Sequence, residues 1–123
     1  VVKMLNSGVD GTMVFEPAVI KVSIGDTIHF KATDLSHNSA SMAGMIPSGA
    51  DSWAGMLSQD ISVTLDKEGV YVYQCDPHVM MAMVGVIQVG NAVNIDEVKS
   101  VAADQKSKFI MNSSRLEQYL SQL

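Results

Sequence analysis

Short runs of β-branched and aromatic residues, separated by turns that contain glycine and aspartate, dominate the first 90 residues. In segments 27–32 and 61–65 the apolar residues occupy alternate positions, which is the pattern of a strand with one buried face. Segments 18–24, 70–74 and 84–89 are more continuously apolar, and each is followed by glycine or cysteine. Several short strands at this spacing predict a mainly β fold, either a sandwich or a barrel.

The pattern becomes helical in the last part of the chain. Asn94 is followed three residues later by Glu97, as at the capped start of a helix, and apolar residues then recur at helical spacing. A second helix is predicted over roughly 108–120. We therefore expect a single domain over 1–123, with a β-sandwich at 1–90 and a tail of two short helices at 94–123 packed on it.

The composition narrows the class of protein. A chain of 123 residues with 47% hydrophobic and 17% charged residues is typical of one globular domain and not of a disordered segment. No apolar run approaches the roughly 20 residues that span a bilayer, and a net charge of −5 argues against nucleic-acid binding. The chain begins at Val1 with neither an initiator methionine nor a leader pattern, so we expect a mature, processed product.

The only cysteine lies among other possible metal ligands. A single cysteine cannot form an internal disulfide, so it is a free thiol, an intermolecular bridge or a metal ligand. Cys75 is followed by His78 and Met83, and His37 lies in a loop-like segment at 36–58. One thiolate, two imidazoles and one thioether form the ligand set of a blue-copper electron-transfer site.

This ligand set suits a metal that changes oxidation state. Cuprous copper prefers sulfur and cupric copper accepts imidazole nitrogen, so the mixed set serves both states with little rearrangement. Zinc is the competing metal, but it normally takes four strong ligands, and only three lie within reach here. His29 alternates onto the polar face of its strand and is interpreted as a surface residue.

Two neighbours of these residues are candidates for tuning the site. Pro77 has no N–H and cannot donate a hydrogen bond toward the cysteine sulfur. Asn38 has an amide that could tie the two loops together and donate toward the sulfur, although an ordinary loop residue is an equal alternative. Met80, Met81 and Met83 all lie within reach as the thioether ligand, so spacing alone leaves that position open.

The sequence resembles the pseudoazurins, a family of small bacterial cupredoxins, along nearly its whole length. The stretches that carry the resemblance are Met4-Leu5-Asn6, Met13 to Ala18, Gly25-Asp26-Thr27, His37-Asn38, Met45-Ile46-Pro47, Gly69-Val70-Tyr71, Cys75 with Pro77-His78, and Met81 with Met83. The resemblance implies a Greek-key cupredoxin β-sandwich of about eight strands with two short C-terminal helices.

The resemblance also implies a ligand set. One type 1 copper per chain would be held by His37, Cys75, His78 and Met83, and Met13 would lie beside the exposed histidine ligand. Four protein ligands leave no open position on the metal, and no acid/base pair lies beside them, so an enzyme is not expected. The electron would pass through the edge of His78. The docking patch around it would comprise Met13, Pro77, Val79, Met80 and Met81.

A pseudoazurin-like chain implies a periplasmic one-electron carrier. Its redox partner would be a copper nitrite reductase, or alternatively nitrous-oxide reductase or a c-type cytochrome, docking transiently on a monomer. A copper chaperone or binding protein without redox turnover is the alternative function.

Two features depart from the family pattern. Ala82 stands where the family usually has glycine. The lysines that usually surround the copper end are missing, and Asp34, Asp51 and Asp76 lie near the predicted ligands in sequence. We therefore expect docking to depend little on ionic strength, or to favour a partner with basic groups.

Overall fold

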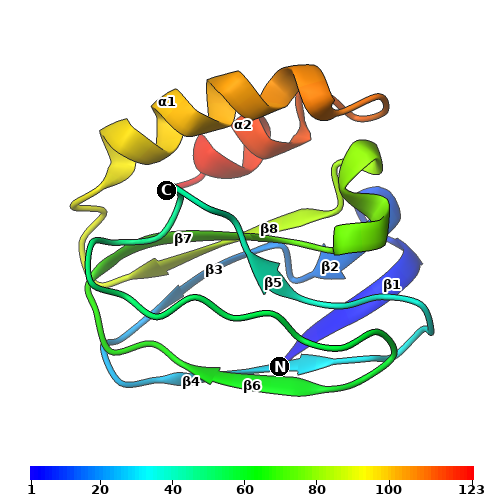
Figure 1. Cartoon of the computed structure of the whole chain (residues 1–123), viewed down its shortest axis with the longest axis horizontal. Helices are drawn as coiled ribbons and strands as arrows, with labels where there is room; N and C mark the ends of the chain where they lie inside the picture. The colour runs from blue at the N-terminus through cyan, green and yellow to red at the C-terminus, as the bar shows by residue number, and fades with distance from the viewer.

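The computed structural model describes residues 1–123 and contains two four-stranded sheets packed face to face (Figure 1). One sheet has the order β2-β1-β4-β6 and the other the order β3-β8-β7-β5. The strands are β1 (Val2–Gly8), β2 (Gly11–Glu16), β3 (Val19–Val22), β4 (Thr27–Lys31), β5 (Ala40–Ser41), β6 (Ile61–Thr64), β7 (Gly69–Gln74) and β8 (Val84–Val89). The predicted sandwich of about eight strands is confirmed.

The connections between strands bring distant loops to one end of the sandwich. From β2 to β7 each successive strand lies in the opposite sheet, so every connection crosses from one layer to the other. The β1–β2 turn, the loop after β4 and the segment between β7 and β8 all lie at the right-hand end of Figure 1. The last two of these connections contain all four predicted metal ligands, and Met13 lies in β2 just after the β1–β2 turn.

Strand β7 is buried on both faces, which explains its continuously apolar sequence. Tyr71 and Tyr73 point between the two sheets, where the side chains of Phe15 and Phe30 pack edge-on against Tyr73. Val70 and Val72 point to the other face and pack under the C-terminal helices. Burying each such side chain stabilises the fold by about 1.5–3 kcal/mol. The core is therefore two layers deep, with β7 and β8 between the layers.

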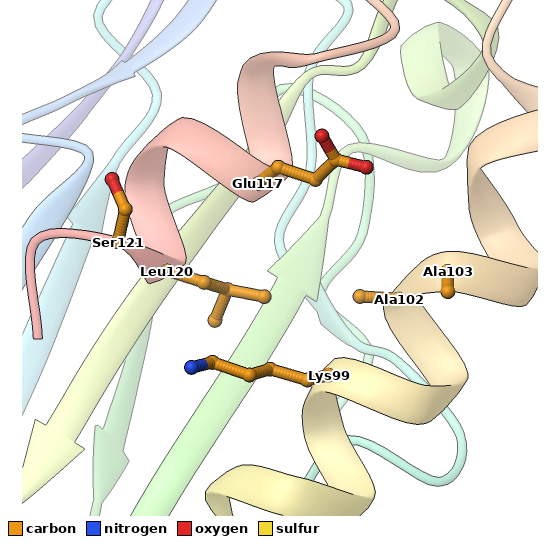
Figure 2. A pocket seen from close by; sticks show the side chains of 6 residues that line it. All are labelled: Lys99, Ala102, Ala103, Glu117, Leu120 and Ser121. Atoms are coloured by element: carbon orange, nitrogen blue, oxygen red, sulfur yellow. The ribbon is translucent and has the colours of Figure 1, made fainter.

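The tail covers the outer face of the β3-β8-β7-β5 sheet (Figure 1). It consists of α1 (Ile95–Gln105), a short 3₁₀ turn η2 (Lys106–Lys108) and α2 (Arg115–Leu120). None of these helices has the length and apolar run that crossing a bilayer requires. A pocket of about 300 Å³ lies between α1 and α2 (Figure 2), and none of the predicted metal-site residues lines it.

The second helix is shorter than the predicted segment 108–120. Residues 109–114 form a loop, because the N–H groups of Ile110 and Met111 donate to the carbonyl of Met80 at 2.7 and 3.1 Å instead of to helical partners. Asn112 then adopts a left-handed backbone conformation with φ of 56°, which no α-helix continues through. The loop-like segment 36–58 likewise contains one short strand, β5, that the sequence did not indicate.

Asn94 does not cap α1 with its side chain, although its sequence context predicted a cap. The side chain is buried, its Oδ1 accepts the N–H of Val70 at 2.6 Å, and its Nδ2 donates to the carbonyl of Val70 at 2.9 Å. Strand β5 pairs with β7 only at Tyr73 and Gln74, so the edge of β7 at Val70 has no neighbouring strand. Asn94 takes the place of that strand.

We expect Asn94→Ala to lower the free energy of unfolding by about 2–3 kcal/mol, because it leaves two buried backbone groups of Val70 without partners. Urea denaturation followed by circular dichroism measures this loss. Asn91→Ala is the control, since the Asn91 side chain makes only an exposed contact to Glu68 at 3.3 Å. It should cost less than about 0.5 kcal/mol. Equal losses in the two variants would contradict this role of Asn94.

Candidate metal centre

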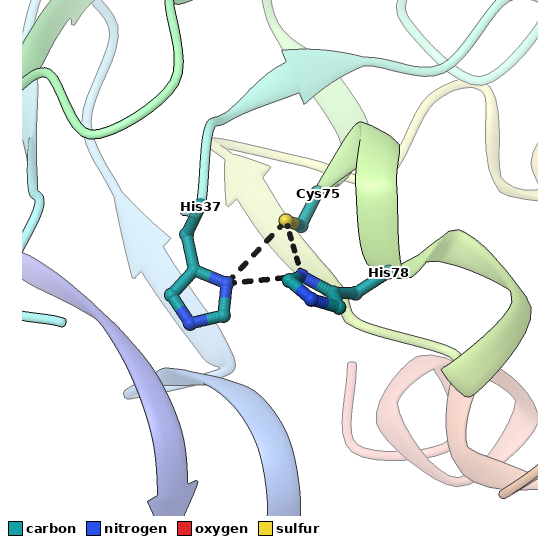
Figure 3. A group of neighbouring side chains, drawn as sticks. All are labelled: His37, Cys75 and His78. Atoms are coloured by element: carbon teal, nitrogen blue, oxygen red, sulfur yellow. Dashed lines mark hydrogen bonds between the residues drawn. The ribbon is translucent and has the colours of Figure 1, made fainter. Parts of the chain in front are cut away.

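His37, Cys75 and His78 converge on one point, as their sequence pattern predicted (Figure 3). The Cys75 Sγ lies 3.6 Å from the Nδ1 of His37 and 3.3 Å from the Nδ1 of His78. The two Nδ1 atoms are 3.1 Å apart. Donors bonded to one ion at about 2.0–2.3 Å are separated by roughly 3.3–3.8 Å. The two sulfur–nitrogen separations lie within this range and the separation of the two nitrogens is slightly shorter, so the triangle fits a single metal ion.

The β7–β8 connection supplies two of these three donors. Cys75 follows directly after β7, and residues Asp76–Met81 form the 3₁₀ helix η1. Pro77 lies in the first turn of η1, where its missing N–H leaves no helical hydrogen bond unmade. The N–H of His78 donates to the carbonyl of Cys75 at 3.1 Å, and this turns the imidazole back toward the sulfur. His37 comes from the loop after β4.

The site is dry on one side and open on the other. Cys75 and His37 are both 0% exposed, whereas His78 is only half-buried. Burial raises the pKa of the Cys75 thiol, and backbone hydrogen bonds from Asn38 and His78 oppose that rise. Burial and the neighbouring His78 lower the pKa of His37, which keeps this imidazole neutral. A neutral imidazole is the form that binds a metal, and a bound cation would supply the charge that a buried thiolate needs.

Asn6 orients His37, a role that the sequence pattern did not reveal. The Nε2 of His37 lies 2.7 Å from the side-chain Oδ1 of Asn6, which can only accept. The proton of the neutral ring is therefore on Nε2, and the lone pair of Nδ1 faces Cys75 and His78. Such a partner fixes the ring and its tautomer for metal binding.

Asn38 joins the two loops that carry the ligands. Its Oδ1 accepts the backbone N–H of Asp76 at 2.7 Å, and its Nδ2 donates to the carboxylate of Asp76 at 2.9 Å and to the carbonyl of Gly55 at 3.1 Å. The amide is thus occupied by Asp76 and Gly55 and does not donate to the sulfur. The backbone of Asn38, and not its side chain, makes the hydrogen bond that opposes the rise in the Cys75 pKa.

The three candidate thioethers occupy different environments. Met83 is 0% exposed, and its carbonyl accepts the N–H of Cys75 at 2.9 Å. Met81 is half-buried, and Met80 is 53% exposed at the end of η1. Met13, near the start of β2, is half-buried. Among the candidates left open by spacing, Met83 is therefore the one inside the protein next to Cys75.

The comparison with protein families decides what kind of centre this is. Residues 2–90 match the family described as copper binding proteins of the plastocyanin/azurin family. The chain belongs to this cupredoxin family. The match covers the whole β-sandwich and includes all four candidate ligands.

The relatives of this cupredoxin include pseudoazurins. It is 48% identical over 101 residues to the pseudoazurin of Methylorubrum extorquens, covering 81% of this chain and 68% of that protein. It is 38% identical to the pseudoazurin of Paracoccus pantotrophus, covering 91% of this chain and 78% of that protein. The crystal structure of pseudoazurin from Hyphomicrobium denitrificans superposes with a TM-score of 0.87 at 36% identity, covering 99% and 95% of the two chains.

These relationships confirm three expectations from the sequence. The chain resembles pseudoazurins, it has the cupredoxin fold with a helical tail, and copper is the metal of its family. The soft thiolate with two imidazoles in the structure fits copper better than zinc. This cupredoxin is therefore a copper electron carrier and not an enzyme.

We expect Asn6→Ala to weaken copper binding by about 10- to 100-fold, because the His37 ring loses the acceptor that fixes its tautomer. Titration of the apoprotein with cupric ion against a competing chelator measures the affinity. Ser7→Ala is the control, since Ser7 is the exposed neighbour of Asn6 on the same strand. An unchanged affinity in Asn6→Ala would show that His37 is oriented without this contact.

Proposed function

We propose that His37, Cys75, His78 and Met83 hold one type 1 copper ion and that the protein is a periplasmic one-electron carrier. The observation that carries this proposal is the triangle of two imidazoles and one thiolate, buried except at the edge of His78. The periplasmic location follows the resemblance to pseudoazurins. A bound copper ion would supply one-electron chemistry between its cuprous and cupric states.

The residues of the site keep the ligand arrangement fixed while an electron moves. Cys75 and Met83 flank a loop whose two ends are held by paired strands, and Asn38 ties this loop to the one that carries His37. A preorganised arrangement of this kind needs little rearrangement when the charge of the metal changes. The buried positions of Cys75 and His37 also exclude water from the sulfur side.

The electron would enter and leave through the half-buried edge of His78. Val79 and Met81 are half-buried in the same loop, Met80 is 53% exposed, and Met13 is half-buried near the start of β2. We assign these residues, with Pro77, to a docking patch. The tail loop enlarges the patch, because Ile110 and Met111 are 77% and 49% exposed and both hydrogen-bond through their backbones to Met80.

Two carboxylates, those of Asp34 and Asp76, lie beside the loops that carry the ligands. The Asp76 carboxylate accepts hydrogen bonds from Asn38 and Gln74, and the Asp34 carboxylate accepts the N–H of Asn6. Each of these carboxylates is therefore held close to a ligand-bearing loop. An apolar patch bordered by such charges suits a short-lived complex whose interface buries less than about 1,200 Å² of surface in total. The carboxylates of Asp34 and Asp76 would repel an acidic partner.

We propose a copper nitrite reductase as the redox partner of a monomeric carrier, with nitrous-oxide reductase or a c-type cytochrome as alternatives for the same patch. A copper chaperone without redox turnover is the competing function. A chaperone must release its ion readily, which favours an open site. The full burial of Cys75 and His37 favours retention of the ion instead.

We expect apoprotein mixed with cupric ion to develop an intense visible absorption band from charge transfer between the Cys75 thiolate and copper. Cys75→Ser should abolish the band, because the hydroxyl oxygen is not a soft ligand. Absorption spectroscopy during a copper titration checks this. A colourless and easily removed copper ion in the unmodified protein would favour the chaperone function.

Met83→Leu and Met81→Leu form a matched pair for the thioether position. Leucine preserves much of the volume of methionine but has no sulfur to bind copper. Met83→Leu should shift the band and the reduction potential, whereas Met81→Leu should leave both near their original values. The reverse result would place the thioether ligand at Met81.

We expect the second-order rate of electron transfer to a copper nitrite reductase to change less than about threefold between roughly 20 and 200 mM salt. Met80→Lys should lower this rate about tenfold by placing a charge in the apolar patch. Stopped-flow spectroscopy of the copper band measures both effects. A steep fall of the rate with salt would contradict docking through apolar contact.

Ile24→Lys is the control for Met80→Lys. Ile24 is 57% exposed in the turn between β3 and β4, at the opposite end of the sandwich (Figure 1). The substitution adds the same charge and removes an apolar side chain of similar size. It should leave the electron-transfer rate unchanged, so an equal fall in the two variants would exclude the proposed patch.

A further inference from the structure

Arg115 on α2 is a buried cation without a carboxylate partner. The residue is only 5% exposed, and the single salt bridge of the structure joins Lys106 to Glu117 elsewhere on the tail. Its guanidinium meets backbone carbonyl oxygens instead. The two N–H groups of Nη1 are shared among four carbonyl oxygens, those of Thr12 at 3.2 Å, Met13 at 3.0 Å, Met81 at 3.4 Å and Ala82 at 3.3 Å. Nη2 donates to the carbonyl of Asp10 at 3.3 Å.

These carbonyls belong to two segments that are far apart in sequence. One segment comprises Asp10 in the β1–β2 turn and the first residues of β2, which include Met13 of the docking patch. The other is the end of the ligand loop, immediately before Met83. Both segments lie more than 30 residues from Arg115 in sequence. A single side chain of the tail therefore bridges two segments at the end of the sandwich where the metal site lies. A buried guanidinium is tolerated only where its donors find acceptors, and the five carbonyls provide them.

Two of the bridged residues have an unfavourable backbone conformation. Met13 has a φ of 53° and Ala82 a φ of 55°, both in the left-handed region. For a residue with a Cβ this conformation is sterically unfavourable, and it persists where surrounding contacts impose it. The carbonyls of both residues accept from the same Nη1.

We propose that Arg115 is a positioning residue for the metal centre. Its guanidinium holds Met13 and Ala82 in their left-handed conformations, and it thereby fixes the end of the ligand loop from which Met83 enters the site. Lysine would replace two donating nitrogens with one on a shorter side chain, so it cannot reproduce the contacts of Nη1 with both segments together with that of Nη2 with Asp10. The C-terminal helix thus acts on the copper site through hydrogen bonds to the backbone.

Tyr119 provides a matched comparison on the same helix. Its hydroxyl donates to the carboxylate of Asp10 at 3.3 Å, so it also links α2 to the β1–β2 turn. It makes no hydrogen bond to the ligand loop. Tyr119→Phe therefore loosens the attachment of the helix without touching the loop, which separates general stabilisation from positioning.

The test compares Arg115→Met, Arg115→Lys and Tyr119→Phe as apoproteins by amide hydrogen exchange. The reporter is the N–H of Met83, which donates to the carbonyl of His78 at 3.3 Å, and the reference is the N–H of Val86, which donates to Ala18 at 2.8 Å. Both arginine variants should raise the ratio of reporter to reference exchange rates at least about tenfold. Tyr119→Phe should leave this ratio unchanged. Arg115→Lys keeps a charge on α2 and serves as the milder variant if Arg115→Met fails to fold.

A second readout uses the copper-loaded proteins. The arginine variants should shift the visible charge-transfer band, and Tyr119→Phe should not. An unchanged exchange ratio and spectrum in both arginine variants, or full rescue by Arg115→Lys, would overturn the proposal. The exchange measurement needs neither copper nor a redox partner, so its outcome is independent of the proposed electron-carrier role.

Ala82→Gly tests the part played by backbone strain. Glycine adopts the left-handed conformation without a steric cost. In an Ala82→Gly background, Arg115→Lys should therefore raise the exchange ratio by less than it does in the original chain. An equal increase in both backgrounds would overturn the proposal that Arg115 imposes the conformation of Ala82.

Discussion

The metal centre depends on the last backbone hydrogen bond between the end of β7 and the start of β8. The two strands pair from Gly69 with Val89 up to Gln74 with Val84, and the N–H of Cys75 then donates to the carbonyl of Met83 at 2.9 Å. Cys75 and Met83 are thus opposite one another at the point where the regular pairing ends. The loop between them is closed by this hydrogen bond, so the positions of its thiolate and thioether residues follow from the register of two buried strands.

Burial on both faces makes that register unambiguous. Side chains of β7 alternate between the layer shared with the other sheet and the layer under the helices, and both layers are apolar. A shift by one residue would exchange Tyr71 and Tyr73 with Val70 and Val72, whose volumes do not fit the opposite layers. The helical tail is therefore part of what positions the copper ligands, since without it β7 and β8 would each have an exposed apolar face.

The sequence predicted those features that rest on local pattern. The spacing of Cys75 and His78, together with a distant histidine, was enough to predict a metal site, and alternating or continuous apolar segments predicted five of the eight strands. The contacts that were missed are long-range ones. Asn94 has the context of a helix cap but pairs with Val70, and Arg115 looks like an ordinary helical residue but bonds to Met13 and Ala82. A local sequence pattern does not specify which distant carbonyl a side chain will hydrogen-bond to.

One loop must serve two opposing requirements. In the proposed function its inner side holds Cys75 and Met83 rigidly in a dry environment, while its outer side presents Met80 to a partner that binds and leaves quickly. The tail acts on both sides, because Arg115 bonds to the inner end of the loop and the backbones of Ile110 and Met111 bond to the carbonyl of Met80. A change in the tail loop can therefore alter the docking surface and the ligand geometry together, although no tail residue belongs to the proposed ligand set.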